Sequence, residues 1–175
     1  MTPLIVLISV TLILLAAGAA GVRRLRPWPV ALRGGLAAMF VLTGVSHFVG
    51  MREDLINMVP PALPAPGLLV TITGVLELAG AAGLLTRRTA PWAAGGLSAL
   101  LVAMFPANVY AAVEGLTLDG DPATSLVPRT LMQLVYLAAT LTVLAYHLRE
   151  RRRVIRASDN NAHDDSARSA AITQR

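Results

Sequence analysis

The sequence predicts an all-α integral membrane protein, a polytopic bundle of five transmembrane helices, and three observations support this. Of the 175 residues, 55% are hydrophobic and 14% are charged, and the mean hydropathy is +0.62, which is too apolar for an ordinary soluble domain. The apolar residues fall into five blocks, each long enough to cross about 30 Å of hydrocarbon as a helix. Arginines cluster at alternate ends of these blocks, as they do in multi-pass proteins.

The first predicted span covers residues 3–22, a continuous apolar run followed by Arg23, Arg24 and Arg26. The alternative is a cleaved signal peptide, which the small residues at 16–21 would suit. Signal peptides carry their positive charge before the apolar segment, whereas here it comes after. The pattern therefore favours an uncleaved helix, which Pro27 and Pro29 end.

The second span, 34–50, follows Arg33, whose side chain could snorkel to the interface. Residues 51–66 contain four prolines, which predict an extended or partly re-entrant loop. The remaining spans are 67–85, 92–113 and 129–148, with a polar loop at 114–128. Pro106 interrupts the fourth span and frees the carbonyl of Val102.

These spans make residues 1–148 one transmembrane domain, and residues 149–175 a basic and then disordered cytoplasmic tail. The arginines predict the orientation, because one set of connections is rich in them and the opposite set holds only Arg52 and Arg129. By the positive-inside rule, the N-terminus lies outside and the C-terminus in the cytoplasm, in the cell membrane.

Polar residues inside the spans gather in the outer half, which predicts a polar pocket open to the outside. Glu77 lies deepest, about 15 Å down the third span by the helical rise, and an acid there is costly enough to indicate function. Glu77 and His47 are the candidate proton-handling residues, and Tyr136 and His47 are the expected partners of the acid. The candidate ligand-binding residues are Thr43, Thr73, Asn108, Gln133, Tyr136 and Thr140.

Each of these residues also has a structural interpretation. Thr, Asn, Gln and His form hydrogen bonds between membrane helices, worth about 0.6 kcal/mol each on average. Asn108 could cap carbonyls freed by Pro106, and Glu77 could be a neutral carboxyl bonded to a neighbouring helix. Gly74, Glu77 and Gly80 are spaced three apart and predict one stripe for close helix packing.

Composition excludes several classes of function. Cysteine is absent, so no disulfide, thiol catalysis, or Cys-ligated zinc or iron–sulfur site is expected. The three histidines are dispersed along the chain, which argues against a haem site, and no metal site is predicted. The 15 basic residues are all arginines beside apolar blocks, so nucleic-acid binding is not expected despite the pI near 11.0.

A combination of glycines, prolines and polar residues in spans two to four and the loop at 51–66 carries a resemblance to a known family. The residues are Gly44, His47, Phe48, Met58, Val59, Pro60, Leu63, Pro64, Thr73, Gly74, Glu77, Gly80, Gly83, Leu84, Phe105, Pro106, Ala107 and Asn108. Together they resemble the DoxX family of small membrane proteins, over residues 33–146. That resemblance implies a four-helix membrane core, matching spans two to five, to which the first helix is an addition. Some DoxX proteins are subunits of a thiosulfate:quinone oxidoreductase, and others are linked to membrane complexes with soluble enzymes.

Two classes of function are therefore open. The first is a membrane subunit of an oxidoreductase complex that binds a quinone or similar lipid in the outward-facing pocket and works with membrane or soluble redox partners. The absence of cysteine requires that electrons come from a bound cofactor or a partner. The second is a non-enzymatic protein of the bilayer that scaffolds partners or binds a lipid or small solute.

Overall fold

The computed structural model describes residues 2–118, 121–122 and 125–173. Its long helices are α1 (Thr2–Ala19), α2 (Trp28–Ser46), α4 (Pro66–Leu85), α5 (Ala90–Val113) and α6 (Leu126–Thr173). The shorter elements are a 3₁₀ helix, η1 (Arg23–Leu25), the helix α3 (Arg52–Asn57), and the strands β1 (Thr117–Leu118) and β2 (Asp121–Pro122), which pair antiparallel.

All five long helices contain a segment long and apolar enough to cross a membrane, and the one in α6 covers Leu126–Arg153. The predicted all-α bundle of membrane helices is therefore confirmed. Large apolar side chains on the outer faces, such as Ile13, Val75 and Val102, are well exposed and suit contact with lipid.

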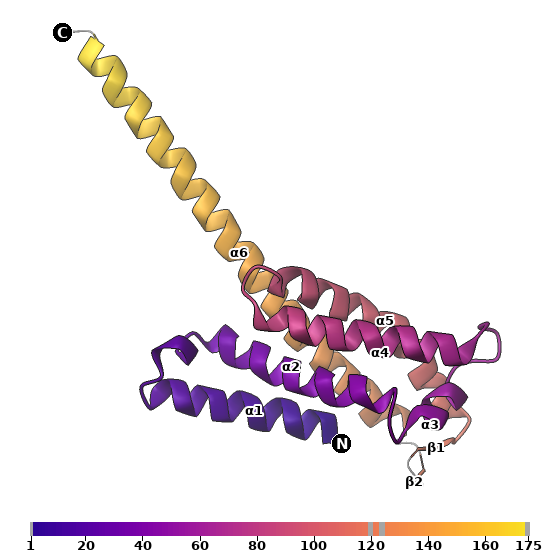
Figure 1. The fold of residues 1–175 in the computed structure, drawn as a ribbon. Helices are drawn as coiled ribbons and strands as arrows, with labels where there is room; N and C mark the ends of the chain where they lie inside the picture. The colour runs from indigo at the N-terminus through magenta and orange to yellow at the C-terminus, as the bar shows by residue number, and fades with distance from the viewer. Residues whose placement is uncertain (1, 119–120, 123–124, 174–175) are drawn as a thin grey trace.

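Successive long helices run in opposite directions, so the bundle has two distinct ends (Figure 1). We call one end the hairpin end, because it carries α3 and the β1–β2 hairpin. We call the other the arginine end, because it holds η1, the connection 86–89 and the residues that follow 148. At the arginine end, the ring of Trp28 meets that of Tyr146 edge-on, with centroids 5.8 Å apart.

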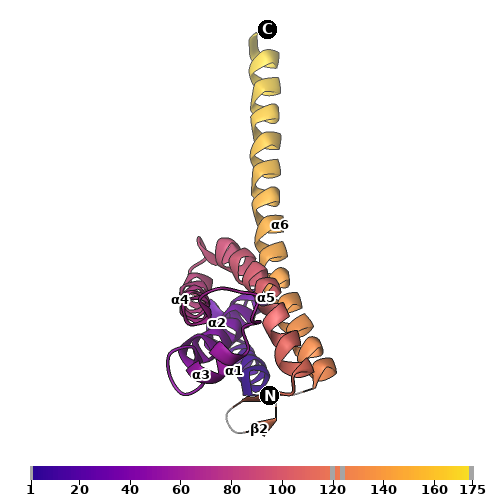
Figure 2. The same cartoon turned by 90° about the vertical axis from the view of Figure 1, so that its right-hand side faces the viewer.

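Helix α2 lies in the middle of the bundle, where it packs against α1, α4 and α6 (Figure 2). Its side chains Leu36, Met39 and Phe40 are fully buried and meet Leu97 of α5 and Val143 of α6 in one core. The bundle is thus organised around one span, and the residues at its C-terminal end are placed among three other helices.

Arg33 differs from the expectation that it snorkels to the interface. Its side chain is buried, and Nε donates a hydrogen bond to the carbonyl of Leu84, 2.6 Å away. The last carbonyls of a helix have no partner within the helix, and Leu84 is near the end of α4. Arg33 therefore caps α4 and joins two spans.

Two segments outside the predicted spans also differ from the predictions. The loop at 51–66 begins with α3, because all four of its prolines follow this helix and its first turn carries Glu53 and Asp54, which favour a helix N-terminus. Helix α6 continues beyond the apolar segment to Thr173, where a disordered tail was predicted. No proline or glycine follows Pro128, so no residue there breaks the helix (Figure 1).

Candidate functional site

Two adjoining cavities open at the hairpin end. The larger has a volume of about 560 Å³ and lies between the end of α2, the α3 region, α4 and α5. The smaller, of about 240 Å³, lies among α2, α4, α5 and α6, and Pro3 of α1 also lines it. Both are lined by His47, Leu55, Met58, Met104 and Asn108, so the two cavities share one wall.

The larger cavity is almost entirely apolar. His47, Thr73 and Asn108 supply its polar side chains, and the rest of the lining is aliphatic residues, methionines and prolines. Much of this lining coincides with the residues on which the DoxX resemblance rests, namely His47, Met58, Val59, Pro60, Leu63, Thr73, Pro106, Ala107 and Asn108.

Most of the polar residues predicted from the sequence as candidate site residues line the smaller cavity. Thr43 and His47 come from α2 and its C-terminal end, Glu77 from α4, Asn108 from α5, and Gln133 and Tyr136 from α6. Spacing explains the two pairs that come from one helix, Thr43 with His47 and Gln133 with Tyr136, because residues three or four apart share one face. The structure therefore brings together side chains from four helices around one small volume.

Glu77 is 4% exposed, and its hydrogen-bond partner among the described residues is Thr43. The hydroxyl of Thr43 lies 2.6 Å from Oε2 of Glu77 and 3.4 Å from the carbonyl oxygen of Phe40. This differs from the expected pairing of Glu77 with Tyr136 and His47, which line the same cavity without such a bond. The difference arises because α4 packs directly on α2 at this level, and a methyl group placed on Gly44 would reach within 3.3 Å of Glu77 Cβ.

His47 follows the last residue of α2 and is 3% exposed. Its Nδ1–H donates to the carbonyl oxygen of Thr43, 2.8 Å away, which fixes the ring and leaves Nε2 for another partner. Arg52 of α3 forms two hydrogen bonds beside His47. One of its nitrogens donates to the carbonyl of His47 and another to the hydroxyl of Thr71, each at 3.0 Å. The end of α2 is therefore tied to the start of α4.

Asn108 and Gln133 make hydrogen bonds that the sequence did not indicate. Arg129 of α6 donates to Oδ1 of Asn108 at 2.9 Å, so this amide oxygen accepts a hydrogen bond from a guanidinium of the neighbouring helix. Gln133 donates to the carbonyl of Leu101 at 2.6 Å. Both bonds join α5 to α6 at the rim of the smaller cavity.

Thr73 and Thr140 are placed differently from the other candidates. Thr73 lines only the larger cavity, and its hydroxyl lies within 3.0 Å of the carbonyls of Leu69 and Val70 in its own helix. Thr140 lines neither cavity; it is fully buried and receives a 2.8 Å hydrogen bond from Ser98 of α5. Thr140 thus joins α5 to α6 as helix-to-helix hydrogen bonds do.

Two features of the site were not predicted from the sequence. Arg129 was considered only for orientation, although it lines the smaller cavity from the first turns of α6. Four methionines, Met39, Met51, Met58 and Met104, also line this cavity. Methionine is flexible and polarizable and adapts to ligands of irregular shape. The repeated occurrence of methionine near His47 in the sequence is the pattern that could have indicated this lining.

Among the described residues, no group of three or more His, Cys, Asp or Glu side chains is arranged to hold a metal ion. The chemistry that the site offers consists of one buried carboxyl, one imidazole, one phenol, two amides and one guanidinium beside an apolar volume. These groups can orient a polar head by hydrogen bonds and exchange a proton with it.

The apolar helices and the cavity between them define a multi-pass α-helical membrane protein. A family model described as "Domain of unknown function (DUF8561)" matches residues 36–149, and the chain belongs to this family. The match includes every lining residue of both cavities except Pro3, and it leaves out α1. Comparisons with curated proteins and with solved structures gave no match.

Proposed function

We propose that this protein binds a quinone or a similar isoprenoid lipid in the two adjoining cavities, as a membrane subunit of an oxidoreductase complex. The observation that supports this best is the shared wall between an apolar cavity and a polar one. An amphiphile fits such a site, with its tail against the aliphatic wall and its head among the polar groups. The volume of the larger cavity, about 560 Å³, is in the usual range for small-molecule sites.

Resemblance to the DoxX family supports the same proposal. The residues that carry it are scattered over 65 positions of the sequence, from Gly44 to Asn108, yet half of them line the larger cavity. Residues shared for packing alone would be spread through the whole bundle. Their concentration around one cavity favours a ligand site held in common.

Glu77 and Thr43 supply the proton chemistry of the proposal. The Thr43 hydroxyl has one hydrogen and can accept as well as donate. With an ionised Glu77, that hydrogen is donated to the carboxylate; with a protonated Glu77, the carboxyl can donate to Thr43. The pair therefore accommodates both states, as a group that passes a proton to a ligand head must. The chain lacks cysteine, and the electrons for a redox reaction would come from a bound cofactor or a partner protein.

Retention of a lipid by the purified protein tests the proposal. After mild detergent extraction, mass spectrometry of organic extracts should find a quinone or isoprenoid in near-stoichiometric amount. Glu77→Gln should stay folded but lose the ligand or fail to restore function to a deletion strain. Tyr136→Phe should weaken ligand retention, whereas Tyr146→Phe, at the opposite end, should leave it unchanged.

Three results would contradict the proposal or part of it. If no amphiphile is retained and partner proteins co-purify instead, the non-enzymatic scaffold replaces the ligand-binding subunit. If Glu77→Gln keeps full activity and only Glu77→Leu is harmful, through lost stability, the acid is a structural residue. Binding of a lipid without any redox partner would favour the lipid-binding alternative.

The proposal also places the arginine end in the cytoplasm and the hairpin end outside the cell membrane, because arginine-rich connections stay inside. The chain has no cysteine, so a single introduced cysteine is the sole thiol. In intact cells, Ala62→Cys should react with a membrane-impermeant maleimide and Arg153→Cys should not. Labelling of both from the same side would contradict five spans.

A further inference from the structure

A third hollow, of about 410 Å³, lies at the arginine end, opposite the two cavities described above. It runs between α6 and the connection that joins α4 to α5. We call it the arginine groove; its lining residues are Arg87, Arg88, Pro91, His147, Glu150, Arg151 and Ile155. Three guanidinium groups and one carboxylate give it a net positive charge.

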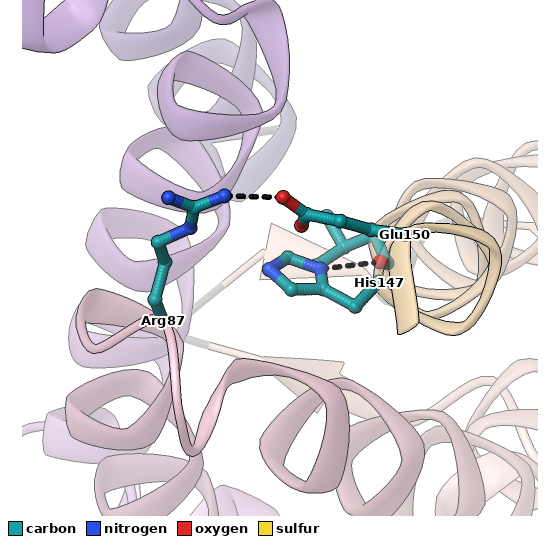
Figure 3. A network of polar contacts seen from close by, with 4 residues as sticks. Arg87, His147 and Glu150 are labelled. Carbon is teal, nitrogen blue, oxygen red and sulfur yellow. Dashed lines mark hydrogen bonds and ion pairs between the residues drawn. The ribbon is translucent and has the colours of Figure 1, made fainter. Parts of the chain in front are cut away.

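Glu150 neutralises only one of these arginines. Its carboxylate pairs with Arg87 across the groove, and Figure 3 shows this pair with the ring of His147 beside it. Arg88 and Arg151 are exposed and form no hydrogen bond or ion pair with the described part of the chain. Two cations therefore remain available to an anion from outside the protein.

His147 gives the groove a fixed polar group. The side chain is 5% exposed, and its Nδ1–H donates to the carbonyl oxygen of Val143, 2.8 Å away. The ring is therefore held in one orientation. In Figure 3 its other nitrogen lies on the side of the ring that faces Arg87. A ligand in the groove would meet an oriented imidazole edge between the guanidinium groups.

We propose that the arginine groove binds the phosphate of an anionic phospholipid headgroup. The position of the groove selects a lipid over a soluble phosphate compound, because Arg87 and Arg88 lie directly after the apolar span of α4 and Arg151 lies near the end of that of α6. The groove also has an apolar side formed by Pro91 and Ile155, which suits the glycerol and upper acyl region. Basic pockets between helices at the cytoplasmic surface bind such headgroups.

Lipid titration of the full chain tests this site. The protein in a neutral detergent is titrated with phosphatidylglycerol or phosphatidylcholine, and bound lipid is counted by native mass spectrometry. The protein should bind one molecule of phosphatidylglycerol, and with higher affinity than phosphatidylcholine. Arg88→Gln with Arg151→Gln should weaken its binding about 30-fold, which corresponds to about 1 kcal/mol for each arginine.

The matched control is Arg24→Gln with Arg26→Gln, which removes the same charge from the same end but outside the groove. It should leave the affinity for phosphatidylglycerol within about twofold, because neither arginine lines the groove. Equal losses in the two double variants would show a diffuse surface charge and overturn the site. So would equal binding of both lipids.

Millimolar inorganic phosphate is the last arm of the experiment. If phosphate displaces the lipid completely, the groove is a site for a soluble anion and the lipid assignment is wrong. Melting temperatures equal to that of the parent should confirm that the double variants fold, since the replaced side chains are exposed. The result does not depend on the cavities at the hairpin end.

Discussion

Gly74→Ala tests how closely α4 must approach the end of α2. A Cβ atom added at Gly74 would lie 2.6 Å from Cβ of His47 and 2.9 Å from Cε2 of Phe48. Ordinary van der Waals contact begins near 3.4 Å, so the new methyl group is too close to His47 by 0.8 Å. Because the atom it meets is a Cβ and not the tip of a flexible side chain, the backbone of α2 must move.

The expected cost follows from comparison with a second glycine. Overpacking by one methyl group lowers the free energy of unfolding by about 1–3 kcal/mol, while replacing glycine by alanine within a helix raises it by up to about 1 kcal/mol. At Gly96, also in a membrane helix, nothing lies within 4 Å of the added Cβ, so only the helix term applies. The difference between the two alanine variants therefore isolates the packing cost, and about 1–3 kcal/mol corresponds to about 2–12 °C in Tm for a chain of this size.

Thermal unfolding in detergent measures this difference. Gly96→Ala should melt at or slightly above the temperature of the parent, and Gly74→Ala should melt several degrees lower. Ligand retention should fall in Gly74→Ala as well, because His47 is displaced from the wall that both cavities share. Equal melting temperatures for the two variants would refute the close contact between α4 and α2, and with it the placement of His47.

Two further substitutions test the packing of the other helices. Gly80→Leu should destabilise the bundle, because even a Cβ at this position would lie 2.5 Å from the side chain of Leu97 on α5; a variant that melts like the parent would place Gly80 against lipid. Thr140→Val keeps the shape of the side chain but removes its bond with Ser98, and should cost about 0.6 kcal/mol in stability without changing ligand retention. Loss of ligand with unchanged stability would instead make Thr140 a ligand-binding residue.

The sequence by itself determined the five membrane helices and their approximate ends. In a bilayer, the backbone N–H and C=O groups of a helix must form hydrogen bonds with one another. An apolar block of about 20 residues bounded by proline or arginine is therefore expected to be a membrane-spanning helix. The predicted span 67–85 accordingly differs by one residue from α4, Pro66–Leu85. The second span, predicted at 34–50, is instead α2, Trp28–Ser46, because Pro29 is accommodated in the first turn of a helix and does not exclude one. The same logic selected Glu77 and His47, since a polar group in such a block is conspicuous in the sequence.

Only the tertiary structure decided which polar groups meet. Lipid is as apolar as a helix surface, so hydropathy does not indicate which helix lies beside which. The hydrogen bond from Thr43 to Glu77 exists because α4 packs on α2, and the predicted stripe on α4 divides, with Gly74 against α2 and Gly80 against α5. Arg33 also became a buried cap, because the end of α4 came within its reach. The sequence thus defined the helices and their polar residues, while side-by-side packing made the site.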